Sequence, residues 1–252
     1  GQARVKPPGK ATDAPNGYRW SADGAQLEAI PGGPADPNTP KALPPAQAAK
    51  REEARRKESR LLTSATAGGN FNASVRSLAS PTISAGGSFT VSGTGTVELG
   101  TATAGSALSI TSQTITFNRL TSAVTIDLVA SGNVTGGDAV ATGRIGVNAG
   151  GRFAYGAFDG GAIGIVSRSV AGGALLARTG DLNLYASGDA SIGAVNAAGY
   201  VGIDADLLAF SNITAGGGFG TTNERMTGTS ISAGQDISIS TEGDVSLSGL
   251  SG

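Results

Sequence analysis

From Ala65 onward, apolar residues alternate with small polar residues in short segments. In Ile237-Ser238-Ile239-Ser240 and Val245-Ser246-Leu247 the branched residues stand two apart, with serine between them. This period of two is typical of a β-strand that turns one face inward and the other outward. Because glycine separates the segments, the pattern predicts a series of short strands joined by tight turns.

The strands belong to a degenerate repeat in which a small residue and usually a glycine precede an alternating segment. Copies of this pattern begin at Ala85, Ala104, Ser122, Ala149, Ala171, Ala198, Ala215 and Ala233. The clearest steps are 19 residues, from Ala85 to Ala104, and 18 residues, from Ala215 to Ala233. Half-step copies begin at Thr179 and Ser187. Coils of this length, with two or three strands each, indicate a parallel β-helix.

The composition of this part fits a narrow tube better than a wide sandwich. Only 5% of the chain is aromatic, and the inward positions hold small or branched residues. We therefore expect an all-β fold, a parallel β-helix (solenoid) over residues 65–252, with roughly nine coils of about 20 residues. Glycine is expected to supply the corner conformations that other residues resist.

Residues 1–62 differ sharply from the rest. They hold all five lysines, nine of the ten prolines and a net charge of +4, whereas residues 63–252 contain no lysine and carry −5. This change predicts a boundary near residue 62. Residues 1–44 are expected to be a disordered leader rich in proline and glycine, with a small hairpin at Tyr18 and Trp20 as the alternative. Residues 45–62, rich in Ala, Glu, Lys and Arg, are expected to form a charged α-helix.

Composition also excludes several classes of chemistry. The chain has no cysteine and no histidine, which removes thiolate zinc sites, cysteine nucleophiles and the commonest general base. No cofactor or metal is expected. The negative charge of the second part argues against nucleic acid as a partner of the β domain. The sequence shows neither a secretory signal nor an apolar run long enough for a transmembrane segment.

Two places stand out as candidate sites. The stretch 150–170 breaks the period and concentrates aromatic and arginine residues, so we expect a loop or bulge that forms the binding site; its residues are Arg152, Phe153, Tyr155, Phe158 and Arg168. The alternative is that these aromatics fill the tube. Asp204 and Asp206 lie on one side of a strand, as a pair of catalytic carboxylates would, or as two solvent-facing charges would.

The repeats carry a resemblance to a known family. The strings Ala85-Gly86-Gly87-Ser88-Phe89-Thr90-Val91 and Ala233-Gly234-Gln235-Asp236-Ile237-Ser238-Ile239 resemble the repeats of filamentous-haemagglutinin-like bacterial adhesins and autotransporter passengers. The resemblance covers residues 65–252. It implies a right-handed β-helix on a secreted, cell-surface stalk. The secretion-signal domain and the translocating barrel expected of such proteins are not in this sequence.

A second, short resemblance lies in the leader. Residues 14–37 are similar to an element of phage-encoded virion proteins. It implies an alternative location, the virion, and an alternative role as a tail-fibre or internal structural protein.

The leading functional hypothesis is a non-enzymatic, adhesive β-helical rod, extracellular or at the bacterial cell surface. The rod would present a binding surface to a glycan or protein receptor. The virion role is the first alternative, and a polysaccharide-degrading β-helix enzyme is the second. The charged helix and the solenoid ends are the candidate surfaces for homo-oligomer formation.

Overall fold

The computed structural model describes residues 18–20, 27–29, 59–61 and 64–252. The chain divides into two units, Gly1–Arg56 and Lys57–Gly252. In the first unit, β1 (Tyr18–Trp20) pairs antiparallel with β2 (Leu27–Ala29), so the leader contains the hairpin that the sequence offered as an alternative. The rest of the leader lies outside the described residues.

Of the predicted helix at 45–62, the structure describes only residues 59–61. Residues 45–58 lie outside the described residues, whereas Ser59–Leu61 form β3, which pairs parallel with β6 (Ser77–Ala85). The last turn of the expected helix is therefore a strand. The solenoid accordingly begins before residue 65, at β3.

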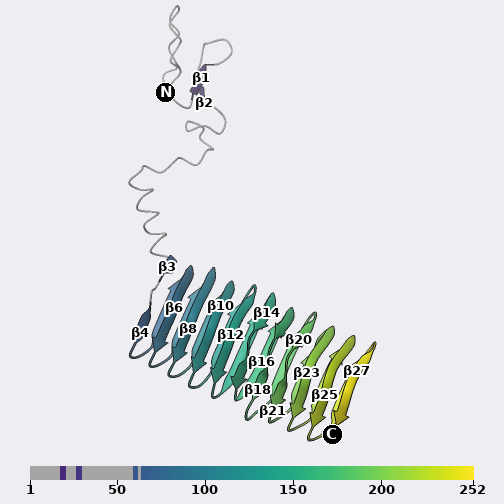
Figure 1. Ribbon diagram of the computed structural model, residues 1–252. Helices are drawn as coiled ribbons and strands as arrows, with labels where there is room; N and C mark the ends of the chain where they lie inside the picture. Colours follow the sequence, from purple (N-terminus) through teal and green to yellow (C-terminus); the bar gives the residue numbers. More distant parts are fainter. Residues whose placement is uncertain (1–17, 21–26, 30–58, 62–63) are drawn as a thin grey trace, which may run out of the picture. The chain divides into compact units, whose positions relative to one another are not determined.

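The second unit is a parallel β-solenoid, as the repeat predicts (Figure 1). One wall of it, which we call the short-strand sheet, contains ten strands, one more than the nine coils expected. Its strands are β5 (Phe71–Val75), β7 (Phe89–Gly93), β9 (Leu108–Ser112), β11 (Ile126–Ala130), β13 (Arg144–Ala149), β16 (Ala162–Ser167), β19 (Leu182–Ala186), β22 (Val201–Asp204), β24 (Phe219–Asn223) and β26 (Ile237–Thr241).

The remaining strands form a second sheet of fifteen strands, which we call the long-strand sheet. Besides β3 and β6, it contains β4 (Ala65–Ala67), β8 (Thr96–Ala104), β10 (Thr114–Ser122), β12 (Val134–Ala141), β14 (Arg152–Tyr155), β15 (Phe158–Gly160), β17 (Ser169–Gly172), β18 (Leu175–Ala177), β20 (Ala190–Ile192), β21 (Val195–Ala197), β23 (Leu207–Ala215), β25 (Arg225–Ala233) and β27 (Val245–Ser251).

Each long strand bends in the middle. Burial along β6 and β10 alternates, but two successive exposed residues interrupt the alternation at the fifth and sixth positions. Both halves of the strand can then turn their apolar residues inward, which requires a bend between them. In four coils the strand is divided into two, as in β14 and β15, which are separated by Gly156 and Ala157. The coil therefore has three sides.

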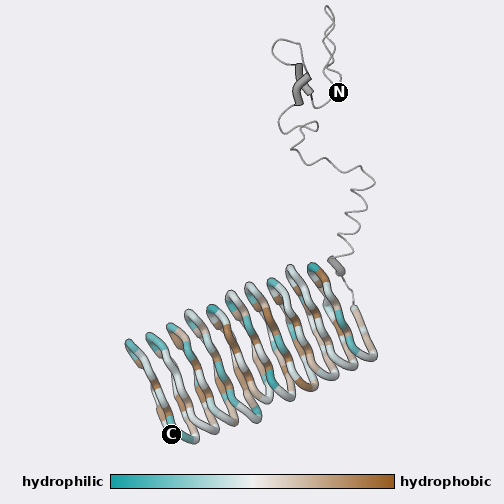
Figure 2. The backbone as a smooth tube through the Cα atoms, turned by 180° about the vertical axis from the view of Figure 1, so that it is seen from behind, coloured by the Kyte–Doolittle hydropathy of each residue, from teal (hydrophilic) through white to brown (hydrophobic). Residues whose placement is uncertain are grey.

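The core is a set of stacked rows that run from coil to coil. The register places Phe89, Leu108, Ile126, Ile145, Ile163, Leu182, Val201 and Phe219 in one such row, and all of them are buried. The 19-residue step from Ala85 to Ala104 and the 18-residue step from Ala215 to Ala233 are both ladder pairs. Figure 2 shows hydrophobic and hydrophilic positions alternating along the tube. Each coil thus buries its apolar residues against its neighbours, which is how a solenoid gains stability.

One inner row alternates large aromatic residues with glycine. A Cβ on Gly136 would overlap the ring of Phe117 in the preceding coil, and the same holds for Gly172 under Tyr155 and Gly228 under Phe210. The glycines therefore provide the space that each inward ring occupies. We call these three contacts the interior ring–glycine pairs.

The corner glycines serve a purpose other than the one expected. None of the glycines within residues 64–252 has a φ between +20° and +160°, so the corners do not demand a left-handed backbone. Instead, a Cβ on Gly86 would collide with the carbonyl oxygen of Gly68, and one on Gly150 with that of Ser131. Glycine is required here because successive coils approach each other closely.

Candidate functional site

The structure places most of the predicted contact patch inside the core. Phe153, Tyr155 and Phe158 are buried, and their ring centroids lie 4.9–5.3 Å apart. The prediction that these three aromatics contact a ligand is wrong, and the alternative that they fill the tube is confirmed. Arg152 and Arg168 are exposed, and a binding role for them stays a prediction.

The break in period that suggested a loop has a simpler origin. The ladder pairs Phe153 with Val170, 17 residues later, and Val170 with Ala190, 20 residues later. A short coil is followed by a long one, and the strands continue through both. Burial raises the pKa of the Tyr155 phenol well above its usual 10.0, and its hydroxyl donates a weak hydrogen bond to the Gly173 carbonyl at 3.4 Å.

The two candidate carboxylates do not share a strand, because β22 ends at Asp204 and Asp206 lies in the corner that follows. Asp204 and Asp206 are exposed, and Ala205 between them is buried. Asp204 Oδ1 accepts a hydrogen bond of 3.1 Å from the backbone N–H of Thr222 in the next coil. This carboxylate therefore stabilises the stacking of two coils. The enzymatic alternative stays a prediction.

An open concave surface with exposed aromatic side chains lies elsewhere, on the outer face of the short-strand sheet; a second hollow of similar volume, beside Thr94 and Gln113, has no aromatic side chain in its lining. The surface with the aromatic side chains is an open groove of about 690 Å³ that crosses the strands from β11 to β26. Four glycines of the groove floor stand in one outward column, which is the row of equivalent outward-facing positions on successive coils: Gly146, Gly164, Gly202 and Gly220. The ladder pairs Gly146 with Gly164 and Gly202 with Gly220, while Asn183 stands between the two pairs. We call this surface the glycine groove.

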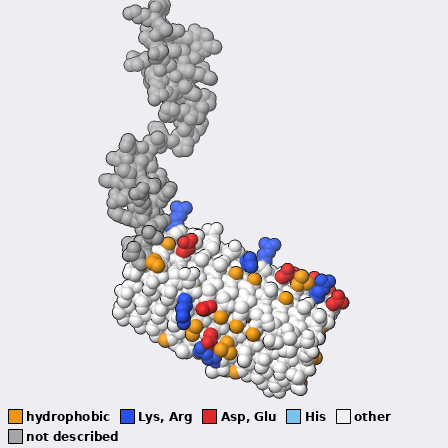
Figure 3. Space-filling model, in the orientation of Figure 1, with side chains coloured by type: hydrophobic (Ala, Val, Ile, Leu, Met, Phe, Trp, Pro, Cys, Tyr) orange, Lys and Arg blue, Asp and Glu red, His pale blue; other side chains and the backbone are white. Residues whose placement is uncertain are grey.

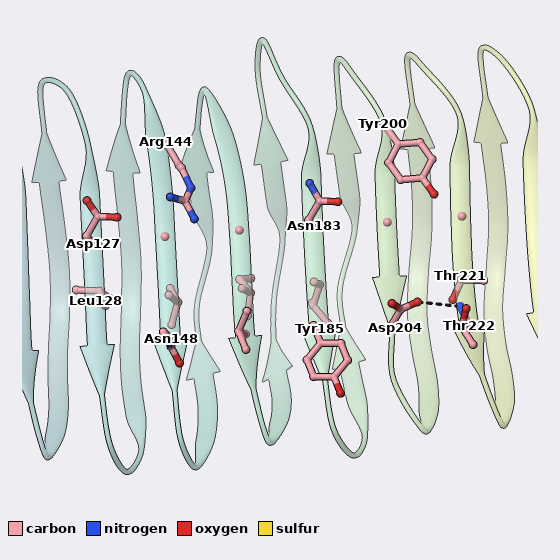
Figure 4. A pocket seen from close by; sticks show the side chains of 18 of the residues that line it. Asp127, Leu128, Arg144, Asn148, Asn183, Tyr185, Tyr200, Asp204, Thr221 and Thr222 are labelled. Carbon is pink, nitrogen blue, oxygen red and sulfur yellow. Dashed lines mark hydrogen bonds between the residues drawn. The ribbon is translucent and has the colours of Figure 1, made fainter.

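Larger side chains border the groove on both sides. Figure 4 shows Arg144, the first residue of β13, and Tyr200, just before β22, at one border of the groove, and Asn148, Tyr185 and Asp204 at the other. Tyr185 is 52% exposed and Tyr200 is 43% exposed. Figure 4 looks onto the sheet and shows both tyrosine rings face-on, so the rings lie roughly parallel to the sheet. The rings thus present flat faces to solvent.

Tyr200 lies flat because its neighbours have no side chains. A Cβ on Gly202 would be 3.0 Å from Tyr200 Cε1, and one on Gly220 would overlap the Tyr200 hydroxyl. Its backbone is fixed by the coil beneath, where Asp181 Oδ1 accepts a 2.8 Å hydrogen bond from the Tyr200 N–H. The ring therefore rests on glycine backbone and remains 43% exposed.

Polar side chains cover the other glycines in the same way. Positions for a Cβ on Gly146 and on Gly164 lie 2.8 Å from Asp127 Oδ1 and 3.1 Å from Arg144 Nη2, respectively. Among the described residues, the ion pair is that of Arg178 with Asp159. Arg144 therefore has no described acidic partner. The groove consequently offers a guanidinium, carboxylates and amides beside two exposed rings.

Two classes of site were searched for within the described residues. No group of three or more acidic side chains there is placed to hold a metal ion. No described helix is long and apolar enough to cross a membrane.

Sequence reasoning missed the glycine groove, although a signal was present. Tyr185 alternates with the buried Leu184 and Ala186, which marks it as an outward aromatic residue. The glycines of Ile145-Gly146-Val147 and Ile163-Gly164-Ile165 also stand at outward positions between inward ones. What the sequence lacks is the register that makes these glycines neighbours, since the coil length varies.

Comparison of the chain with protein-family models, with curated proteins and with solved structures gives no match.

Proposed function

We propose that the protein is a non-enzymatic, adhesive rod whose solenoid presents the glycine groove as its contact surface. The observation that carries this proposal is the groove itself. It is an open, concave surface on the wall of the solenoid, and it contains two exposed tyrosines. Exposed aromatic side chains gathered in a concavity with polar groups are typical of binding surfaces.

The stacked coils suit a role as a rigid support. Because each coil contacts only its neighbours, the solenoid extends a surface in one direction without a large globular core. The ten-stranded wall holds most of the groove on strands that are paired on both sides, and side chains fixed on strands keep their positions better than those on loops. A binding surface of this kind is preorganised, which lowers the entropic cost of association.

The face of the solenoid drawn in Figure 3 consists mostly of small polar side chains and backbone. Charged and hydrophobic side chains are scattered over this face. Isolated apolar residues on a surface require no functional explanation. The gathering of aromatics and hydrogen-bonding groups in the glycine groove is therefore the feature that supports a contact role there.

A groove-filling substitution tests the proposal. Gly164→Leu places an apolar side chain on the groove floor, where its nearest neighbour is the flexible end of Arg144 rather than backbone. Thr90→Leu is the matched control, because Thr90 is exposed in the same outward column but outside the groove. The full chain and both variants would be applied to an array of immobilised polysaccharides, glycoproteins and matrix proteins.

We expect the parent chain to bind at least one class of ligand on the array. Gly164→Leu should abolish that binding, and Thr90→Leu should leave it unchanged. Circular dichroism would confirm that all three chains have the same β-sheet content. Binding that survives Gly164→Leu, or no binding to any member of the array, would contradict the proposal.

A further inference from the structure

We propose that the ligand of the glycine groove is a neutral, linear oligosaccharide that crosses the groove obliquely and stacks its sugar rings on Tyr200 and Tyr185. This inference rests on the proposed function, because it names the chemistry of the ligand at the same site. It is argued from the shape, the aromatic surface, the polar groups and the charge of the groove.

The shape favours an extended chain. The groove crosses seven strands, from β11 to β26, and neighbouring strands lie about 4.8 Å apart, so its length is roughly 29 Å. It runs across the strands and is open to solvent along its length (Figure 4). A single sugar would cover only a part of this surface. Tyr185 pairs with Asp204, four residues beyond Tyr200 on the neighbouring strand. A chain that contacts both rings therefore crosses the groove floor obliquely over roughly 14 Å, the length of about three sugars.

The two tyrosines supply platforms for the apolar faces of sugar rings. A pyranose has a face of C–H groups, which packs on the face of an aromatic ring, while its hydroxyls point outward around the rim. Tyr200 rests on the backbone of Gly202 and Gly220, and Tyr185 stands two residues after Asn183 on β19. Tyrosine suits this task because it combines an apolar ring with a polar hydroxyl.

The polar groups around the rings match hydroxyls rather than a single type of charge. Asn148 and Asn183 each offer donors and an acceptor, Asp127 and Asp204 offer acceptors, and Arg144 offers a fork of donors. A sugar hydroxyl both donates and accepts, so it can bind to every one of these groups. A lipid chain or an apolar peptide would leave them unsatisfied, which is costly on burial.

Charge argues against polyanions. The groove contains Arg144 against Asp127 and Asp204, and residues 63–252 carry seven arginines and twelve acidic residues. A nucleic acid or an acidic polysaccharide would require an excess of basic side chains along its path. A neutral chain is free of this requirement.

The backbone argues against an extended peptide. Peptides that bind β-proteins commonly add a strand at a sheet edge, where backbone N–H and C=O groups are unpaired. The groove lies on the face of the sheet, and its strands β13, β16, β19, β22 and β24 are each paired on both sides. Along all of its strands except β26, which is the edge strand at one end of the sheet, the groove therefore offers side chains and glycine Cα atoms rather than a row of free backbone groups.

The test is isothermal titration calorimetry of the full chain with a panel of hexasaccharides. Cellohexaose, xylohexaose, mannohexaose and chitohexaose represent neutral chains, and hexagalacturonate represents an anionic one. We expect at least one neutral hexasaccharide to bind, and to bind more tightly than the disaccharide of the same series. Tyr200→Ala and Tyr185→Ala should each lower that affinity about tenfold, the loss of roughly 1.4 kcal/mol expected of a central aromatic contact.

Leu207→Ala is the matched control, since Leu207 is an exposed apolar residue on β23, outside the groove. It should leave the affinity unchanged. The inference is overturned if no neutral hexasaccharide binds, if only hexagalacturonate binds, or if both tyrosine variants retain full affinity. When groove-dependent binding on the array is confined to proteins, the saccharide inference fails while the contact role of the groove stands. If Gly164→Leu changes no binding on the array, both the saccharide inference and the contact role of the groove fail.

Discussion

The inner face of the long-strand sheet and the outer face of the short-strand sheet both place an aromatic ring over glycine, but the ring has a different role on each face. Inside, the rings of Phe117, Tyr155 and Phe210 occupy the space left by glycines of the following coil. Outside, Tyr200 occupies the space left by Gly202 and Gly220. The inner rings are covered on every side, whereas Tyr200 is 43% exposed. A ring over glycine thus fills the core when it points inward and presents a platform when it points outward.

This comparison predicts that inner and outer rings differ in what their removal changes. Loss of an inner ring leaves a cavity and lowers stability. Loss of an outer ring removes a contact surface and leaves the free energy of unfolding nearly the same.

The largest effect is expected from Phe117→Ala. It should lower the free energy of unfolding by about 3–5 kcal/mol, because the ring is buried and faces a glycine that cannot fill the space. Urea unfolding of the full chain, followed by circular dichroism, measures the change. A loss below about 1 kcal/mol would contradict the role given to the interior ring–glycine pairs.

A double substitution sharpens this point. Gly136→Ala alone should cost about 1–3 kcal/mol, because its Cβ overlaps the Phe117 ring. In the Phe117→Ala background the new methyl has room, so the double variant should be more stable than the sum of the two losses predicts. The same unfolding assay gives the coupling. Additive losses, within about 0.5 kcal/mol, would show that the ring and the glycine do not interact.

A smaller effect is expected from alkaline pH. Burial raises the pKa of Tyr155 in the folded chain above its usual 10.0, so the unfolded chain releases the phenol proton first. Its contribution to stability is therefore fully present below pH 10 and is lost as the pH rises toward the folded pKa, by up to about 1.4 kcal/mol per pH unit. Unfolding midpoints of the parent and of Tyr155→Phe between pH 9 and pH 11.5 measure this. Equal slopes above pH 10 would refute it.

The exposed ion pair should matter little. Arg178 and Asp159 have side chains that are 43% and 30% exposed, so solvent screens their attraction. Arg178→Met should change the free energy of unfolding by at most about 1 kcal/mol. A larger loss in the same urea assay would indicate that Arg178 supports the coil through more than this contact.

The outer ring should have the smallest effect on stability. Tyr200→Ala is expected to change the free energy of unfolding by less than about 0.5 kcal/mol, because the ring lies on the outer face and its removal opens no cavity in the core. Urea unfolding beside Phe117→Ala provides the direct contrast. A loss as large as that of Phe117→Ala would place Tyr200 among the structural residues.

The sequence predicted the solenoid because its corners repeat. Thr179-Gly180-Asp181 and Ser187-Gly188-Asp189, eight residues apart, are two successive corners of one coil, at the start of β19 and of β20. The copy beginning at Ala171 is different, since Ala171 lies within β17 and pairs with Ala154 in the middle of a coil side. Similar strings therefore occur at different positions of the coil, so the spacing between the copies in the sequence is irregular.

The site was harder to predict than the fold for a related reason. Inward residues can be recognised from alternation within one strand, but the glycine groove depends on which outward residues stack across coils. Those coils are 17 to 20 residues long, so the pairing of Gly146 with Gly164 and of Gly202 with Gly220 follows only after each step is known. Aromatics at 153, 155 and 158 drew attention because they are frequent there, yet their alternation with small residues already indicated the inside.

One paired measurement tests the distinction between inner and outer rings most directly. The thermal unfolding midpoint and the hexasaccharide affinity would be determined for Tyr200→Ala and for Phe210→Leu, in the full chain and at a temperature where both variants are folded. We expect Tyr200→Ala to lower the affinity about tenfold with an unchanged midpoint, and Phe210→Leu to lower the midpoint with an unchanged affinity. If Tyr200→Ala lowers the midpoint and retains the affinity, the outer ring is structural and the platform does not exist.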